Sequence, residues 1–534
     1  DKGEQGALAK EGDTTAQIRL LDPQVVSPTF KQLQQSKQYY TFADTLAVDK
    51  YEIDGVSQDT VIAARELALA GNDNRNWVND HTVYTHGYGV VAAYGNKVTA
   101  DGQPKFFEAG IPTQGKLTDS EKYEPRIYFS PNATEYSIVG APEGTKSWEF
   151  DYPTGSEAPP TPSRRWRPKI GNIFSRLLYA IRFGSDQILF SNRVNSNSQI
   201  LYDRSPKERV AKVAPYLTLD GRVYPAVVDG RVKWIVDGYT TSDAYPYSQM
   251  TDLGSVTQDS TTKTSNTIQA LGSQKANYIR NSVKATVDAY DGSVELYAWD
   301  ANDPVLKAWE KIFPGQYHQL SDISGDLMSH VRYPESLFKV QRELLSKYHV
   351  TSANQYYSGE DFWQTPVDPT ESQSQQDQDI LQPPYYLTLQ TGGTKEPVFS
   401  LTSTYIPAGQ STREILTGFL SVDSDAAMRR QDSSNYGTIR LQELPKDSNV
   451  PGPGQAQNNF NASADVSKEL NLLESGSTNV QRGNLLTLPL GGGLVYVQPV
   501  YVKSSGSTSF PLLKKVLVAF GDQVGFANTL DEAL

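Results

Sequence analysis

NSVKATVDAYDGSVELYAWDANDPVLKAWEKIFPG, residues 281–315, combines the signals of a β-hairpin and of a helix. Apolar side chains alternate with polar ones over residues 283–287 and again over 294–298, and an Asp-Gly pair lies between the two runs. Alternation with a period of two predicts strands, and Asp-Gly is a strong signal for the tight turn that joins them. Asp303, followed directly by proline, is typical of a helix start. The stretch therefore predicts strand, turn, strand and helix.

The same hairpin signal recurs along the chain. Asp54-Gly55 separates two runs rich in Val, Ile and Tyr. Asp220, Asp229 and Asp237 are each followed by glycine, which predicts a meander of short strands. The sequence therefore predicts an α+β, β-rich fold, built from several packed β-meander or hairpin units with a few amphipathic helices.

Helices are predicted at three further places. Residues 171–184 space Ile and Leu at helical intervals, and another helix runs from about Pro334 to Tyr348. Between them, SPKERVAKVAPYL begins with Ser205. Its side chain is expected to accept from the backbone amide of Glu208, while the side chain of Glu208 accepts from the backbone amide of Ser205. Such a capping box predicts a helix start at this serine.

The length of 534 residues predicts two to four packed units. Proline-rich or polar stretches supply the expected boundaries. We predict a flexible leader and entry segment (1–38), an N-terminal β-rich unit (39–155), a Pro-rich linker (156–169), a central α+β unit (170–364), a polar mobile linker (365–384) and a C-terminal β-rich unit (385–534).

Composition excludes several classes of function. The chain contains no cysteine, which excludes disulfides, thiolate metal sites and cysteine nucleophiles and hints at an extracytoplasmic protein. The net charge of −12, with both signs interspersed, argues against nucleic acid as a partner. No apolar run approaches the roughly 18 to 20 residues of a membrane span. The basic cluster in RRWRPK, residues 164–169, is compatible with contact to anionic lipid headgroups and also with a loop exposed to solvent.

NWVNDHTVYTHGYGV, residues 76–90, is a candidate ligand site because histidines, aromatics and a carboxylate gather there. If the stretch is extended, His81 and His86 point to opposite faces and share no metal ion. Structural packing, with the glycines allowing close backbone approach, is the alternative. The candidate ligand-binding residues are Arg75, Asp80, His81, Tyr84 and His86, with one histidine as a candidate proton carrier.

Two Asp- and Tyr-rich stretches are candidates for paired carboxylates acting on a glycan, with turns and helix caps as the structural alternative. The first, VDGYTTSDAYPYS, adds Asp237, Tyr239, Asp243 and Tyr245 to the candidate ligand-binding residues. The second, YAWDANDP, offers Ca²⁺ the oxygens of Asp300, Asn302 and Asp303, but lacks the full calcium-loop pattern. No other cofactor is expected, and no complete catalytic motif occurs.

Long stretches resemble an uncharacterised family of large bacterial membrane proteins, which occurs notably in actinobacteria and cyanobacteria. Among them are NWVNDHTVYTHGYGVVAAYGN, EPRIYFSPNATEYSIVG, NSQILYDRSPKERVAKVAPYLTLDG and GNLLTLPLGGGLVYVQPVYV, and the matches span about Tyr39 to Leu534. The resemblance implies several N-terminal transmembrane helices followed by one extracytoplasmic region, to which this chain corresponds. It brings no catalytic residues.

Two functions follow as expectations. The first is an extracytoplasmic binding or assembly module at the cell membrane, serving the cell envelope or a transport complex. Its partners would be the transmembrane helices of its own full-length protein and envelope proteins or glycans. The second is a hydrolase that uses paired carboxylates on an envelope glycan or a lipid-linked sugar. Whether the chain is an enzyme stays open.

Overall fold

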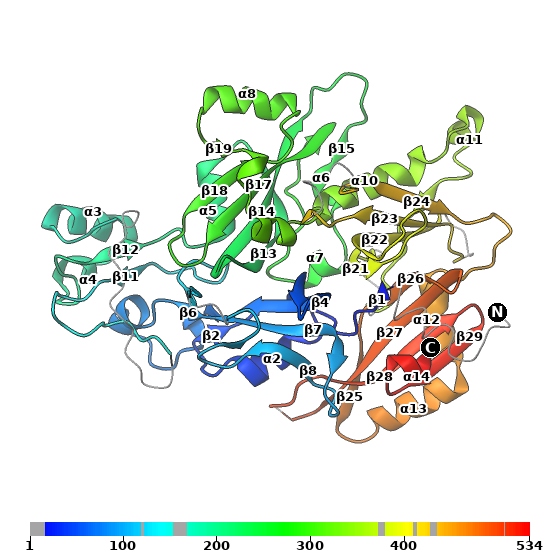
Figure 1. Cartoon of the computed structure of the whole chain (residues 1–534), viewed down its shortest axis with the longest axis horizontal. Helices are drawn as coiled ribbons and strands as arrows, with labels where there is room; N and C mark the ends of the chain where they lie inside the picture. Colours follow the sequence, from blue (N-terminus) through cyan, green and yellow to red (C-terminus); the bar gives the residue numbers. More distant parts are fainter. Residues whose placement is uncertain are drawn as a thin grey trace.

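The computed structural model confirms an α+β fold in which strand exceeds helix (Figure 1). It describes residues 16–118, 122–152, 168–371, 380–409, 414–427, 435–506 and 508–534. The predicted leader up to residue 15 and most of the predicted Pro-rich linker lie outside these ranges.

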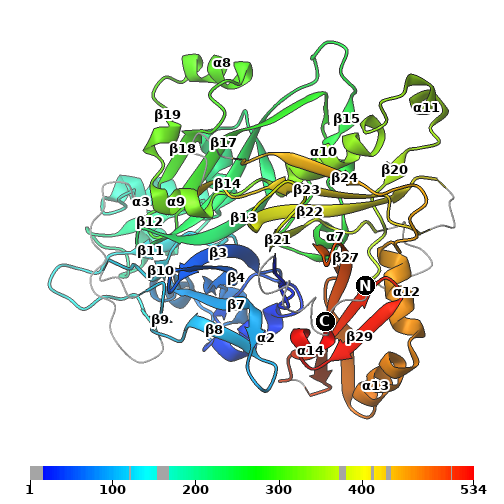
Figure 2. The same cartoon turned by 45° about the vertical axis from the view of Figure 1, so that its right-hand side comes forward.

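Four larger, mostly antiparallel sheets organise the described residues (Figures 1 and 2). The first sheet contains β3 (Ala47–Ile53), β4 (Val56–Ala64), β7 (Val90–Val98), β8 (Pro104–Ala109) and β9 (Gln114–Gly115). The second contains β13 (Thr218–Val228), β14 (Arg231–Ser242), β17 (Tyr278–Asp288), β18 (Val294–Ala298) and β19 (Tyr317–His318). The third contains β1 (Ala16–Gln17), β20 (Trp363–Gln364), β21 (Tyr385–Leu389), β22 (Val398–Pro407), β23 (Gly418–Asp423) and β24 (Ile439–Glu443). The fourth contains β25 (Thr478–Arg482), β26 (Leu486–Leu490), β27 (Gly493–Ser504), β28 (Leu512–Phe520) and β29 (Gln523–Ala527).

Smaller strand pairs and short helices connect these sheets. The pairs are β2 (Tyr40–Thr41) with β5 (Glu66–Leu67), β6 (Gly87–Tyr88) with β10 (Arg126–Ile127), β11 (Ser137–Val139) with β12 (Gln199–Leu201), and β15 (Thr251–Asp252) with β16 (Lys275–Ala276). The helices are α2 (Ser27–Gln34), α3 (Ile173–Phe183), α4 (Gln187–Phe190), α5 (Pro206–Val213), α6 (Leu253–Val256), α7 (Ser260–Thr264), α8 (Pro304–Ile312), α9 (Gly325–His330), α10 (Glu335–Tyr348), α11 (Ala353–Ser358), α12 (Pro453–Ala462), α13 (Ala464–Glu474) and α14 (Leu530–Ala533). The described residues also form two 3₁₀ turns, η1 (Leu69–Gly71) and η3 (Leu320–Asp322), and one π-helical turn, η2 (Asn79–Val83).

The hairpin and helix predicted for residues 281–315 are confirmed as β17, β18 and α8. Asp303 caps α8 by accepting from the backbone amides of Val305 and Leu306 at 3.0 and 3.3 Å. Asp54-Gly55 likewise joins β3 to β4, with φ of 53° and 78°, the left-handed conformation that a type I′ turn requires.

Of the three Asp-Gly pairs between residues 220 and 238, only Asp229-Gly230 forms a turn. The prediction of short strands there is wrong: Gly221 and Gly238 lie inside the long strands β13 and β14, next to register shifts. At Gly221 the reason is close approach, since a Cβ atom there would lie 1.6 Å from the carbonyl oxygen of Gln269.

Two local predictions about capping and backbone are also corrected. α5 begins where predicted, but the side chain of Ser205 makes no capping hydrogen bond. Residues 79–83, considered above as an extended strand, form the π-helical turn η2. In that turn Thr82 donates to the carbonyl of Val78 at 2.7 Å, which supports the local helical conformation.

Apolar cores connect the sheets across the predicted unit boundaries. One core joins Ile62 of the first sheet to Trp234 of the second. Another joins the first, third and fourth sheets through Val61, Leu387 and Val518. The division into three units stays a prediction.

The described flanks of the predicted linker 365–384 are built into the fold. Val367 pairs with Leu381 in a β-bridge, and Asp368 is buried. Residues 372–379 lie outside the described residues.

Candidate ligand-binding cavity

The first group of predicted site residues does not converge on one point. Arg75 forms an ion pair with Asp80, with 2.9 Å between Nε and Oδ2. His81 stacks on Tyr136 with ring centroids 3.9 Å apart, and its Nδ1 lies 2.7 Å from the carbonyl oxygen of that tyrosine. Tyr84 packs against Tyr39 at a centroid distance of 4.4 Å. These neighbours along the chain therefore have separate partners.

His86 is buried and contacts backbone and charge rather than an open space. Its Nδ1 donates to the carbonyl of Gly87 at 2.9 Å, and its Nε2 lies 3.6 Å from Asp151 Oδ1. Asp151 is itself held by Arg126 through bonds of 2.8 and 3.0 Å. Burial lowers the pKa of His86, which favours the neutral ring.

The second group is divided between the core and the surface. Asp237 is buried and forms an ion pair with Lys284, and Tyr239 is buried and donates to Asp220. Asp243 and Tyr245 are exposed on the segment that follows β14. Asp237 and Asp243 therefore do not face a common space.

The candidate calcium residues are engaged within the protein. Asp303 accepts from the hydroxyls of Thr240, Ser282 and Tyr278 at 2.5 to 2.6 Å in addition to its capping bonds. Asp300 forms an ion pair with Arg280 at 3.3 Å, and Asn302 is exposed. Across the described residues, no group of three or more His, Asp or Glu side chains is placed to hold a metal ion.

A different place has the properties of a ligand site. A cavity of about 260 Å³ lies between β4 of the first sheet and β13 of the second, and the start of α5 and three loop segments also line it. At about 30 Å³ per water it has room for roughly nine waters, or for a ligand the size of a monosaccharide. Its lining includes Thr45, Ile62, Ala64, Glu66, Asn132, Ser205, Lys207, Arg222, Tyr224, Trp234, Thr267 and Gln269.

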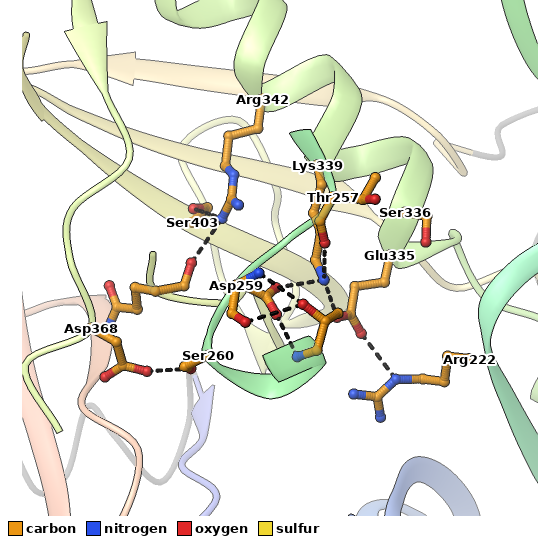
Figure 3. A network of polar contacts seen from close by, with 12 residues as sticks. Arg222, Thr257, Asp259, Ser260, Glu335, Ser336, Lys339, Arg342, Asp368 and Ser403 are labelled. Atoms are coloured by element: carbon orange, nitrogen blue, oxygen red, sulfur yellow. Dashed lines mark hydrogen bonds and ion pairs between the residues drawn. The ribbon is translucent and has the colours of Figure 1, made fainter. Parts of the chain in front are cut away.

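Two cations line this cavity. Lys207, in the first turn of α5, has no ion-pair partner within the described parts of the chain. Burial lowers its pKa, and the charge of Asp220 opposes that effect. Arg222 follows on β13, and its Nε lies 3.1 Å from a carboxylate oxygen of Glu335. The terminal nitrogens of Arg222 are directed away from that carboxylate (Figure 3).

Glu66 contributes a carboxyl group with an altered proton affinity. Burial raises the pKa of Glu66 to about 7, even though Asn132 donates two hydrogen bonds to its Oε2 at 2.9 and 3.0 Å. Near neutral pH this carboxyl is therefore partly protonated, and in that form it can both donate and accept. Perturbed carboxyl groups in cavities are frequent at functional sites.

Thr45 adds an unused hydroxyl to the same lining. Thr45 is 9% exposed, and its Oγ1 has no hydrogen-bond partner in the described structure. A buried hydroxyl without a partner costs free energy, and a ligand or ordered water in the cavity would remove that cost. Two cations, a protonatable acid and a free hydroxyl thus belong to the lining of one cavity.

A buried ionic network fixes Arg222 at the edge of the cavity (Figure 3). Glu335, the first residue of α10, contacts Arg222 through one oxygen and Lys339 through the other, at 3.1 Å each. Lys339 also pairs with Asp259 at 2.5 Å. Burial would raise the pKa of Glu335, but the two cations outweigh it and lower that pKa to about 2. The carboxylate is therefore charged and holds the guanidinium in place.

A second, more open hollow of about 770 Å³ lies between the N-terminal segment, α7 and α13. It contains Asp22, Asp368, Glu371 and Glu474, and burial raises the pKa of Asp368 and Glu371. Asp22 accepts three backbone amides and Asp368 accepts from Ser260 at 2.6 Å, so both have structural roles. No aromatic side chain is among its described lining residues.

The sequence did not reveal the cavity residues, because they come from several separate segments spread between residues 43 and 269. One signal was available: Ser205 and Pro206 mark a helix start with a lysine in its first turn. A helix N-terminus favours anions, and a lysine there strengthens that preference.

Comparison with known proteins matches residues 1–473 to an uncharacterised protein family, UPF0182. A UPF0182 protein of Bifidobacterium longum is 90% identical over 536 residues, covering 100% of this chain and 50% of that protein. A relative from Bifidobacterium adolescentis is 88% identical with 100% and 49% covered, and one from Paenarthrobacter aurescens is 58% identical with 99% and 53% covered. The chain spans about half the length of these curated relatives. No solved structure matches it.

Proposed function

The chain belongs to the uncharacterised protein family UPF0182, and on that premise we propose that it is the ligand-binding module of a longer cell-envelope protein. The cavity between β4 and β13 carries this proposal, because its lining includes the unpaired Lys207 together with Glu66 and Arg222. Binding of a small molecule would satisfy these groups, as is common in pockets with a few convergent polar side chains.

The lining points to a small ligand that carries both a negative charge and hydroxyl groups. The ammonium of Lys207 and the terminal nitrogens of Arg222 are suited to a carboxylate or phosphate. Glu66, Asn132 and Thr45 are suited to hydroxyls, since each offers a donor or an acceptor. A sugar acid or sugar phosphate combines these properties at the size of the cavity.

Thermal melting with defined probes tests this function. Glucuronate and glucose 6-phosphate are expected to raise the melting temperature, and neutral glucose much less, because ligands of the native state stabilise it by mass action. The Lys207→Met variant should lose the shift, whereas Lys311→Met, on the exposed surface of α8, should keep it. Equal shifts for glucose and glucuronate, or an undiminished shift in Lys207→Met, would contradict the proposal.

A hydrolase with paired carboxylates is less well supported by the cavity. That chemistry needs two carboxyl groups about 5 to 9.5 Å apart. The described lining contains a single carboxylate, Glu66. We therefore propose binding rather than glycan hydrolysis.

For location we propose the extracytoplasmic side of the cell membrane. No helix among the described residues is long and apolar enough to cross a bilayer. The relatives are about twice as long as this chain, and we propose that the remaining half contributes membrane-spanning helices that contact it. The absence of cysteine supports the location and also supplies the test.

The test uses a single cysteine, Asp243→Cys, at an exposed position of the full-length protein. A membrane-impermeant maleimide applied to intact cells is expected to label it. Labelling that appears only after lysis would place this region in the cytoplasm.

A further inference from the structure

The outer face of α3 is apolar and exposed. Ile173, Phe174 and Ile181 are 69%, 67% and 71% exposed, and Leu177 and Leu178 lie between them on the same face. Positions i, i+1, i+4, i+5 and i+8 form one stripe along a helix. An apolar stripe of five large side chains is unusual on a surface open to water. α3 and α4 lie at one edge of the molecule, away from the four large sheets (Figure 1).

The opposite face of α3 attaches the helix to the protein, so the exposed stripe is held in a fixed direction. Phe183 stacks on Tyr136 at a centroid distance of 4.6 Å, and Tyr179 packs near Tyr202 at 5.8 Å. Asn172 caps the start of the helix and Gly184, in the left-handed conformation, ends it. The helix therefore needs no partner to form.

The charge around α3 is positive in a chain whose net charge is −12. Residues 168–186 contain Lys169, Arg176 and Arg182 against one acidic residue, Asp186. Arg182 is about half exposed, and its Nη2 lies 3.7 Å from Asp203 Oδ2. An apolar face flanked by cations is typical of helices that lie in the interface of an anionic bilayer.

We propose that α3 docks this domain onto the surface of an anionic lipid bilayer. The apolar stripe enters the boundary between headgroups and acyl chains, while the cations around it meet lipid phosphates. The local positive charge distinguishes this occupant from a second copy of the chain, because each copy carries the same charge on this face. The inference uses none of the cavity residues, so either proposal can fail without the other.

Flotation with vesicles tests the docking. The chain is expected to float with vesicles of phosphatidylcholine and phosphatidylglycerol, less with phosphatidylcholine alone, and less at high salt, because salt screens the headgroup charge. In the double variant Phe174→Gln, Ile181→Gln the apparent affinity should fall at least about tenfold, since two large apolar side chains leave the interface. The matched control is Ile312→Gln, an apolar residue on α8 that is 59% exposed.

Three results would overturn the proposal. The wild-type chain does not float with anionic vesicles, or the α3 double variant floats as well as the wild type, or Ile312→Gln loses as much binding as the double variant. Self-association of the wild type that the double variant abolishes, without vesicle binding, would assign the face to a protein contact instead. Because all substituted residues are exposed, far-ultraviolet circular dichroism should show unchanged folding.

Discussion

Replacing Glu66 with glutamine should remove part of the pH dependence of stability. Glu66 is 2% exposed, and its pKa in the folded protein is about 7 instead of the ordinary 4.5. The folded state thus holds the proton more tightly than the unfolded state. Its contribution to stability is complete below about pH 4.5 and is lost as the pH rises toward 7.

The magnitude follows from the two pKa values. The interval from 4.5 to about 7 corresponds to about 3 kcal/mol, at about 1.4 kcal/mol for each pKa unit. A glutamine oxygen can still accept the two hydrogen bonds from Asn132. We therefore expect Glu66→Gln to resemble the wild type near pH 5 and to exceed its stability by about 3 kcal/mol at pH 8.

Urea unfolding at pH 5 and pH 8 measures the effect. The quantity of interest is the difference between the two proteins in how the free energy of unfolding changes with pH, with Glu360→Gln at the surface as the control. Parallel pH profiles for wild type and Glu66→Gln would refute the reasoning, because they would mean that Glu66 titrates alike in both states.

The ionic network and the helix cap give three further predictions. Lys339→Met leaves Asp259 and Glu335 buried without their shared cation and should cost about 3 to 5 kcal/mol in urea unfolding. The pKa of Glu335 is lowered to about 2, so the ionised carboxylate stabilises the folded state fully above pH 4.5. About 3 kcal/mol of that stabilisation should be lost as the pH falls from 4.5 to 2. Comparison of acid unfolding between Glu335→Gln and the wild type measures this loss. Asp303→Ala removes the cap of α8 and the carboxylate that accepts from the hydroxyls of Thr240, Ser282 and Tyr278. It should lower the free energy of unfolding by about 2 to 4 kcal/mol, and an unchanged urea midpoint would contradict this prediction.

Local signals predicted the secondary structure well where the cause is local. Asp54-Gly55 and Asp303-Pro304 act through turn and cap chemistry that depends on neighbouring residues, and both predictions are confirmed. Gly221 resembles a turn residue in the sequence, but its role is to admit the carbonyl of Gln269, a residue 48 positions away. Tertiary packing determines the role of such glycines, and a short stretch of sequence carries no information about that packing.

The candidate site depends on tertiary packing to a greater extent. Lys207, Arg222 and Glu66 are unremarkable charged residues in the sequence and become a site only when α5, β13 and β5 meet. Glu335 and Lys339 have the four-residue spacing that is typical of an ion pair on the surface of a helix, yet both are buried. In contrast, the histidine, tyrosine and aspartate clusters that stand out in the sequence mostly contact other groups of the protein and do not form a common site.

The central claim is that the cavity binds a small anionic, hydroxylated ligand, and a crystal structure of the chain grown with glucuronate tests it most directly. The account predicts the sugar between β4 and β13, with its carboxylate at hydrogen-bond distance from Lys207 Nζ and the terminal nitrogens of Arg222. A cavity that holds only ordered water at saturating glucuronate would contradict it.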